Sequence, residues 1–298
     1  MEGANVYLSR LTIDVGSDAT RERPGRLWLR NLYHVHQRLC MAFPSKDQIS
    51  QDEHFLKPFK PEDFGNNQVH VKRGADSGFL FRIDPGPKGA VAILVQSAVE
   101  PNWEYAFQNA RCLLVDLGPD RDPWEVKPFD PSFTVGQRVR FRLLANPTKK
   151  IDTLRQEDRQ RYTKEELRQI EGRNGRRVPV PSSEELSAWR NEHPNGDARA
   201  FICRRLLDWI EKKAEPSGFS LEDVSVQPSY TYWKKPEERN KNRPEDHKID
   251  TGRRRSVRYD GTLAVTDPAV FRETIIRGIG PGKAFGFGLL SVAPVRSA

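Results

Sequence analysis

Two successive rounds of the order strand, helix, strand, strand predict an α+β protein built from tandem ferredoxin-like (RRM-like) domains. The chain has 298 residues, about twice the length of an average single domain. Aromatic residues make up 9% of it and can anchor two separate cores, although the hydrophobic share is only 36%. We therefore expect an N-terminal domain over residues 1–133 and a C-terminal domain over residues 134–298.

The first domain begins with Val6–Asp14, which alternates apolar and polar residues as a half-buried strand does. A helix is predicted next, because Asn31 is a good N-cap and an apolar stripe at helical spacing runs from there to Pro44. The stripe consists of Leu32, Val35, Leu39 and Phe43. It marks the face of the helix that we expect to be buried.

The rest of the first domain is predicted to complete a four-stranded sheet. Residues 79–83 and 90–96 read as two strands joined by a turn rich in Gly and Pro over residues 84–89. A short helix is expected near residues 103–110, and Trp124–Phe129 supplies the fourth strand. This order of elements is the one found in a ferredoxin-like fold.

The second domain repeats the pattern and ends with a helix that Asp267 caps, with Pro268 in its first turn. Its other elements, in chain order, are a strand from Gln137, a helical stretch over residues 183–213 interrupted near Pro194, strands over 224–233 and 254–265, and a closing strand over 288–293. Two polar segments, residues 151–178 and 234–258, are expected to be solvated insertions or loops.

Charge narrows the class of partner. A net charge of +8 and an isoelectric point near 9.4 favour an anionic partner, either nucleic acid or an anionic membrane surface. A membrane-bound protein is disfavoured, because the sequence shows no spanning run, no secretory signal and no basic amphipathic helix. Cys40, Cys112 and Cys203 lie too far apart for a disulfide framework or a zinc spacing. We expect a cytoplasmic protein without a metal or another cofactor.

The first helix carries a candidate catalytic pair. Tyr33 and His36 lie three residues apart, so their rings project from successive turns at the flank of the buried stripe. An imidazole exchanges protons at neutral pH and a phenol donates a hydrogen bond or a proton, a combination that suits phosphodiester cleavage. From this helix alone, a boundary histidine bonded to a backbone carbonyl is the more common interpretation.

A glycine-rich segment follows the last predicted helix and contains Lys283. Its glycines are Gly278, Gly280, Gly282, Gly286 and Gly288. Glycines allow backbone amides to approach a phosphate closely, and the lysine adds a cation. The spacing does not fit a Walker loop, and Ala284 stands where such a loop has Ser or Thr. A helix cap with a tight, closely packed turn is an equally good interpretation.

Three groups of basic residues are candidates for RNA contact. Arg138, Arg140 and Arg142 lie on one face of the strand that follows Gln137. Lys149 and Lys150 follow that strand, while Arg253, Arg254, Arg255 and Arg258 lie near the aromatic residues of the segment 230–233. Evenly spaced cations can follow a phosphate backbone and aromatic rings can stack on bases. Ordinary solvated faces and loops are the alternative for each group.

Several blocks together resemble the CRISPR-associated repeat endoribonucleases of type I-E systems, the CasE subfamily. In chain order the blocks are Tyr7-Leu-Ser-Arg-Leu, Asn31-Leu-Tyr-His-Val-His36, Val95-Gln-Ser-Ala, Lys127-Pro-Phe, Arg140-Phe-Arg-Leu-Leu-Ala-Asn-Pro147, Gly278-Ile-Gly-Pro-Gly-Lys and Gly286-Phe-Gly-Leu-Leu-Ser-Val-Ala-Pro294. They span the chain from end to end. The resemblance implies two ferredoxin-like domains that bind the repeat hairpin of CRISPR precursor RNA.

The resemblance also implies an activity and its residues. The family cuts at the 3′ base of the hairpin stem without metal, by attack of a 2′-hydroxyl that leaves a cyclic phosphate, and stays on the mature guide RNA with the other subunits of the Cascade complex. His36 and Tyr33 fall on the family's catalytic positions. Some relatives have a basic residue where this chain has Met41, and Lys283 is a candidate substitute. A non-catalytic RNA-hairpin-binding module is the alternative.

Overall fold

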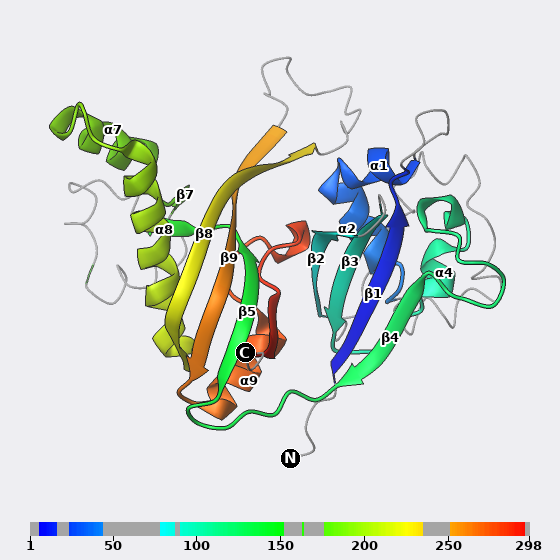
Figure 1. Ribbon diagram of the computed structural model, residues 1–298. Helices are drawn as coiled ribbons and strands as arrows, with labels where there is room; N and C mark the ends of the chain where they lie inside the picture. Colours follow the sequence, from blue (N-terminus) through cyan, green and yellow to red (C-terminus); the bar gives the residue numbers. More distant parts are fainter. Residues whose placement is uncertain are drawn as a thin grey trace.

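The protein is built around two four-stranded antiparallel sheets that lie side by side (Figure 1). The computed structural model describes residues 6–16, 24–43, 78–86, 90–151, 163, 176–234 and 251–295. The strand orders are β2-β3-β1-β4 and β10-β5-β9-β8, and in both sheets the first and third strands of the ferredoxin-like order are central. The structure confirms the predicted α+β class.

The first sheet consists of β1 (Val6–Asp14), β2 (Phe79–Pro85), β3 (Ala90–Ser97) and β4 (Trp124–Phe129). The helices α1 (Pro24–Leu29), α2 (Leu32–Cys40) and α4 (Trp103–Phe107) and the turn η3 (Arg111–Leu113) complete this domain. Leu11 and Ile13 of β1 point into its core, where they meet Val35 and Leu39 of α2. The opposite face of the sheet is therefore left for contact with the second domain.

Helix α2 begins where the sequence predicts and ends earlier. The side chain of Asn31 accepts a hydrogen bond from the backbone N–H of Tyr33, which caps the first turn. The helix ends at Cys40, and residues 41–43 continue as a turn that buries Met41 and Phe43. Pro44, predicted to end the helix, lies outside the described residues. Helix α1 was not predicted.

The second sheet consists of β5 (Arg138–Ala145), β8 (Phe219–Lys234), β9 (Thr251–Val265) and β10 (Leu290–Pro294). Helices α8 (Ala198–Ala214) and α9 (Pro268–Arg277) provide the apolar side chains that cover it, among them Leu206 and Phe271. Strands β8 and β9 extend the two predicted strands into one long hairpin. Phe133, the last residue that we assign to the first domain, packs on the core of the second. The domain boundary after residue 133 stays a prediction.

A helical arm and a short hairpin are added to the second domain. The predicted helical stretch divides into α7 (Ser183–Glu192) and α8, and the break falls near Pro194 as expected. The hairpin of β6 (Thr148–Ile151) and β7 (Arg176–Pro179) forms the two ends of the first polar insertion. Most of both insertions lies outside the described residues.

Glu185 joins the arm to the hairpin. Its backbone N–H donates to the capping Oγ of Ser182 at 3.2 Å. Its carboxylate accepts hydrogen bonds from the Ser182 backbone N–H at 2.8 Å, from Lys149 at 2.9 Å and from Arg205 at 2.7 Å. Partial burial opposes ionisation, but these donors outweigh it and lower the pKa of Glu185 to about 2.

We expect Glu185→Gln to lower the free energy of unfolding by up to about 3 kcal/mol at pH 7. The folded-state pKa is depressed, so the stabilisation is complete above the ordinary carboxyl pKa and is lost as the pH falls through about 2. Calorimetry of the variant and the unaltered protein from pH 7 to pH 3 should show a difference in melting temperature that shrinks with acidity. A difference that does not depend on pH would contradict the assignment.

Candidate active site

His36 lies on the flank of α2, half-buried, as the helical spacing predicts. Its ring packs against two aromatic rings of β2, with centroid distances of 5.5 Å to Phe79 and 6.4 Å to Phe81. Its Nε2 atom is 3.6 Å from the Sγ atom of Cys40, one turn further along the helix. These contacts hold the imidazole beside the edge strand of the first sheet, on the side that faces the second domain.

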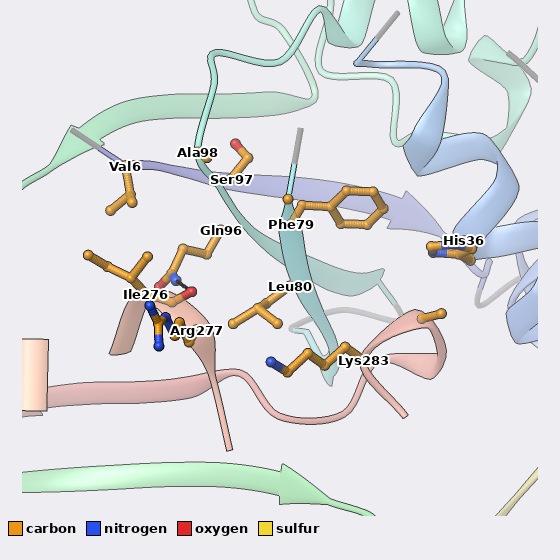
Figure 2. A pocket seen from close by; sticks show the side chains of 12 residues that line it. Val6, His36, Phe79, Leu80, Gln96, Ser97, Ala98, Ile276, Arg277 and Lys283 are labelled. Atoms are coloured by element: carbon orange, nitrogen blue, oxygen red, sulfur yellow. Dashed lines mark hydrogen bonds between the residues drawn. The ribbon is translucent and has the colours of Figure 1, made fainter. Parts of the chain in front are cut away.

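His36 shares a cavity of about 390 Å³ with the glycine-rich segment. Helix α2 and strands β1, β2 and β3 form one side of the cavity, and the end of α9 and the turn η5 (Lys283–Phe285) form the other. Figure 2 shows His36 at one end, with the side chain of Lys283 extending below β2 towards Arg277. The cavity therefore contains an imidazole from the first domain and two cations from the second.

Lys283 and Arg277 are the two cationic residues that line this cavity. Burial, together with the positive charge of Arg277, lowers the pKa of Lys283. Arg277, at the end of α9, pairs with Glu273 at 2.6 Å. Arg277 was missed by the sequence reasoning, since a cation in the last turn of a helix is common for dipole reasons alone.

Close packing and positive φ angles explain why the glycine-rich segment contains glycine at these positions. Gly278 and Gly288 lie back to back: the N–H of Ile279 donates to the carbonyl of Gly288 at 2.9 Å, and a Cβ on Gly278 would lie 2.5 Å from that oxygen. A Cβ on Gly286 would lie 3.1 Å from the ring of Phe81. The φ angles of all five predicted glycines are positive. Packing thus accounts for the glycine content, and phosphate binding by their amides stays a prediction.

Tyr33 and Met41 lie apart from this cavity. Tyr33 is half-buried on α2, with its ring 6.3 Å from that of His34, and it is not among the residues that line the cavity. Met41 is 6% exposed, and its sulfur lies 3.5 Å from a guanidinium nitrogen of Arg38. Position 41 is therefore a core position here, and the substitution of its cation by Lys283 stays a prediction.

The arginine face of β5 is present as predicted, and each arginine has a protein partner. Arg138 pairs with Glu222 at 2.7 Å and Arg142 with Asp260 at 2.5 Å. Arg140 donates to a main-chain carbonyl at the end of β10 at 3.2 Å. The alternate residues of the strand point into the core. An RNA phosphate at this face would have to compete with these partners.

The lysines that follow β5 are on β6. Lys149 pairs with Glu185, and Lys150 is exposed. The long hairpin places the backbone of Arg253 opposite Tyr232, as the sequence pattern indicated, while the side chain of Arg253 lies outside the described part of the chain.

The remaining arginines of the hairpin point in different directions. The guanidinium of Arg254 lies over the ring of Phe285 at 4.7 Å, in the turn η5 to which Lys283 also belongs. Arg255 donates to the carbonyl of Val180, and Arg258 pairs with Asp260 at 2.7 Å. Only Arg254 of these three thus lies against the turn that carries Lys283.

Metal binding and membrane insertion find no support in the described part of the chain. Its residues include no group of three or more His, Cys, Asp or Glu side chains that could hold a metal ion. No helix among them has the length and apolar character needed to cross a membrane.

Comparisons with known proteins extend over nearly the whole chain. The CRISPR-associated endoribonuclease Cse3 of Thermus thermophilus is 30% identical over 97% of this chain and 100% of its own length. The Cascade subunit CasE of Escherichia coli K12 is 24% identical over the same shares of the two chains. A solved structure of Cse3 bound to a 19-nt RNA shares the fold, with a TM-score of 0.56 and 24% identity over 98% of this chain and 100% of that one.

The family described as "CRISPR associated protein" matches residues 6–294. Both domains and the cavity between them fall within this match. The chain therefore belongs to this family of CRISPR-associated proteins.

Proposed function

We propose that this protein is an endoribonuclease that cuts CRISPR precursor RNA at the 3′ base of the repeat hairpin. The observation that carries the proposal is the shared cavity of His36 and Lys283. A histidine on one side and a lysine on the other supply the two functions that phosphodiester cleavage needs, proton transfer and stabilisation of phosphate charge.

The relatives favour the same function. The Thermus protein is named an endoribonuclease and has been solved with RNA, and the Escherichia protein is named a Cascade subunit. We infer that this chain likewise binds repeat RNA and stays on the mature guide RNA within a Cascade complex. The net charge of +8 suits a polyanionic partner.

The proposed reaction needs only groups of the protein and the RNA. The 2′-hydroxyl next to the scissile phosphate loses its proton as its oxygen attacks phosphorus. The bond from phosphorus to the 5′-oxygen then breaks, which leaves a 2′,3′-cyclic phosphate and a 5′-hydroxyl. The imidazole of His36 accepts the first proton or supplies the second, and the ammonium of Lys283 stabilises the negative charge on the phosphate oxygens.

Tyr33 and the basic strands have supporting roles in the proposal. Tyr33 lies one turn before His36, outside the lining of the cavity, and in the proposal it exchanges the complementary proton or holds the phosphate once RNA is bound. The arginine face of β5, the lysines of β6 and Arg254 would hold the phosphates of the stem, since A-form RNA is recognised mainly by shape and backbone contacts. We propose that no metal takes part in the reaction.

We expect His36→Ala to slow single-turnover cleavage of repeat RNA in EDTA by at least about 10²-fold, with hairpin binding retained. His34→Ala is the matched control, because His34 is an exposed histidine on the same helix and does not line the cavity. The product of the unaltered protein should carry a cyclic phosphate. Hairpin binding without any product would favour the non-catalytic module instead.

We expect Lys283→Met to slow the same reaction by about 10²-fold, the usual effect of removing one donor to a developing negative charge. Because the folded-state pKa of Lys283 is lowered, its contribution is complete at low pH and is lost as the pH rises through that lowered value. Lys283→Arg keeps the charge and should extend activity to higher pH. Lys213→Met, at an exposed lysine of α8, is the control. Equal rates for Lys283→Met and this control would remove Lys283 from the mechanism.

A further inference from the structure

We propose that Arg82 is a positioning residue that fixes the glycine-rich segment, and with it Lys283, relative to His36. This inference rests on the proposed function, because it concerns the cavity in which we place the reaction. Arg82 touches neither the cavity nor the reacting atoms. It acts through the contact between the two domains.

Arg82 occupies an unusual position for a charged residue. It is only 3% exposed, although it lies in β2, an edge strand of the first sheet. Strand alternation sends Phe79 and Phe81 into the first core, so that Leu80 and Arg82 face the second domain. A fully buried guanidinium is rare unless it is paired and hydrogen-bonded.

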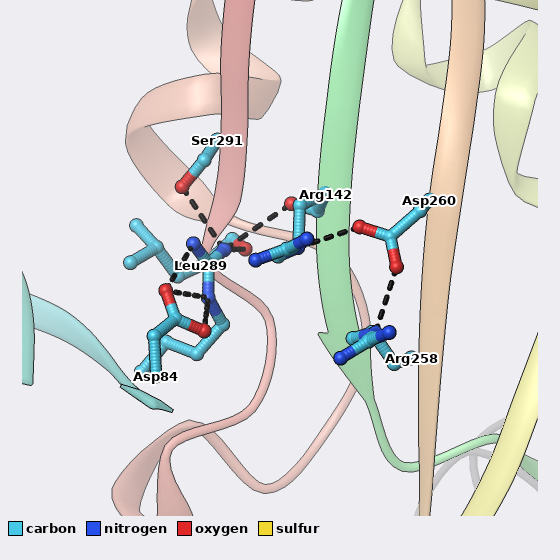
Figure 3. A network of polar contacts seen from close by, with 7 residues as sticks. Asp84, Arg142, Arg258, Asp260, Leu289 and Ser291 are labelled. Carbon is cyan, nitrogen blue, oxygen red and sulfur yellow. Dashed lines mark hydrogen bonds and ion pairs between the residues drawn. The ribbon is translucent and has the colours of Figure 1, made fainter. Parts of the chain in front are cut away.

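Asp84 and the second domain satisfy this guanidinium together. Its Nε and Nη2 atoms donate to the carboxylate of Asp84 at 2.8–3.0 Å. Its Nη1 atom donates to Ser291 Oγ at 3.0 Å and to the carbonyls of Arg142 at 3.3 Å and Leu289 at 3.4 Å. Figure 3 labels these partners: Asp84 in β2, Arg142 in β5, Ser291 in β10 and Leu289, the residue before β10. A single residue of the first domain therefore holds two adjacent strands of the second.

The carbonyl of Leu289 links this contact to the glycine-rich segment. Gly288 ends the segment, and its N–H donates to the carbonyl of Leu144 in β5 at 2.8 Å. Arg82 thus holds the chain one residue after the last glycine. The first sheet also holds the other end, since the buried amide of Gln96 donates to the carbonyl of Ile275 at 2.9 Å. Both ends of the segment are attached to the sheet that packs on α2.

This attachment matters because the site is divided between the domains. His36 belongs to the first domain and Lys283 to the second. A displacement of about 1 Å between catalytic groups can cost about 10²-fold in rate. Leu80, whose Cδ1 atom would lie 2.7 Å from a Cβ on Gly278, provides shape but no directional bond. Arg82 and Gln96 provide directional contacts close to the two ends of the segment, and Arg272 of α9 adds an ion pair with Asp130 at 3.0 Å, further from the segment along the helix.

The test uses the double variant Arg82→Met with Asp84→Asn. Removing both charges avoids an unpaired buried carboxylate, which would destabilise the fold by itself. We expect hairpin affinity close to that of the unaltered protein, because the predicted RNA-binding cations all lie in the second domain. We expect single-turnover cleavage to fall by about 10²-fold. The control is Arg10→Met with Glu125→Gln, an exposed pair at 3.9 Å within the first sheet, which should change neither quantity.

A distance measurement separates this proposal from the proposed function. Spin labels at Cys112 in the first domain and at Lys212→Cys on α8, with Cys40 and Cys203 changed to Ser, report the spacing of the domains. We expect one narrow distance distribution for the parent and a broader one for the Arg82/Asp84 variant. If the unaltered protein does not cut RNA, the proposed function fails, and the spin-label distances still test the positioning role.

Three results would overturn the proposal. They are an unchanged cleavage rate, an unchanged distance distribution, and a loss of affinity as large as the loss of rate, which would make Arg82 an RNA-binding residue. If the double variant does not fold, Arg82→Lys replaces it. The lysine keeps a cation beside Asp84 but lacks the planar fork that reaches Ser291 and both carbonyls. The Arg82→Lys variant should have a melting temperature close to that of the unaltered protein. It should still show the slower cleavage and the broader distribution of spin-label distances.

Discussion

The contact between the two sheets determines what this protein can do. Each domain buries its own core and is an ordinary ferredoxin-like unit, but neither domain alone forms the cavity that His36 and Lys283 line. The edge strand β2 contacts both parts of the cavity. On one face of the strand, Phe79 and Phe81 pack against His36. On the other face, Leu80 and Arg82 contact the two ends of the glycine-rich segment. The proposed cleavage needs the imidazole of His36 and the ammonium of Lys283 at one phosphate. It therefore depends on how β2 packs against α2 on one face and against the glycine-rich segment on the other.

Much of the fold could be predicted because its signals are local. The apolar stripe of α2, the alternation in β5 and the Asp267 cap before Pro268 each act within a few residues, and the structure has all three. The end of α2 was missed because tertiary packing of Met41 and of the following turn outweighs helical spacing there. Helix α1 was missed because it is short and begins with Pro24-Gly25, a pair typical of turns.

The site was only partly predictable, because its residues come from segments far apart in the sequence. The flank position indicated His36 as a candidate and the glycine density indicated Lys283, and the structure places both residues at one cavity. Arg277 and Arg82 carry no such signal: the first looks like a helix-end cation, and the second like one polar residue in a strand. Spacing also could not show that the arginines of β5 pair with Glu222 and Asp260, or that Arg255 faces Val180. Partner choice depends on tertiary contacts.

The most direct measurement is a crystal structure of the His36→Ala protein with an intact repeat hairpin. We expect the scissile phosphate to lie in the cavity between α2 and η5, within hydrogen-bonding distance of Lys283 Nζ and beside position 36. A phosphate bound elsewhere, with this cavity empty of RNA, would contradict it.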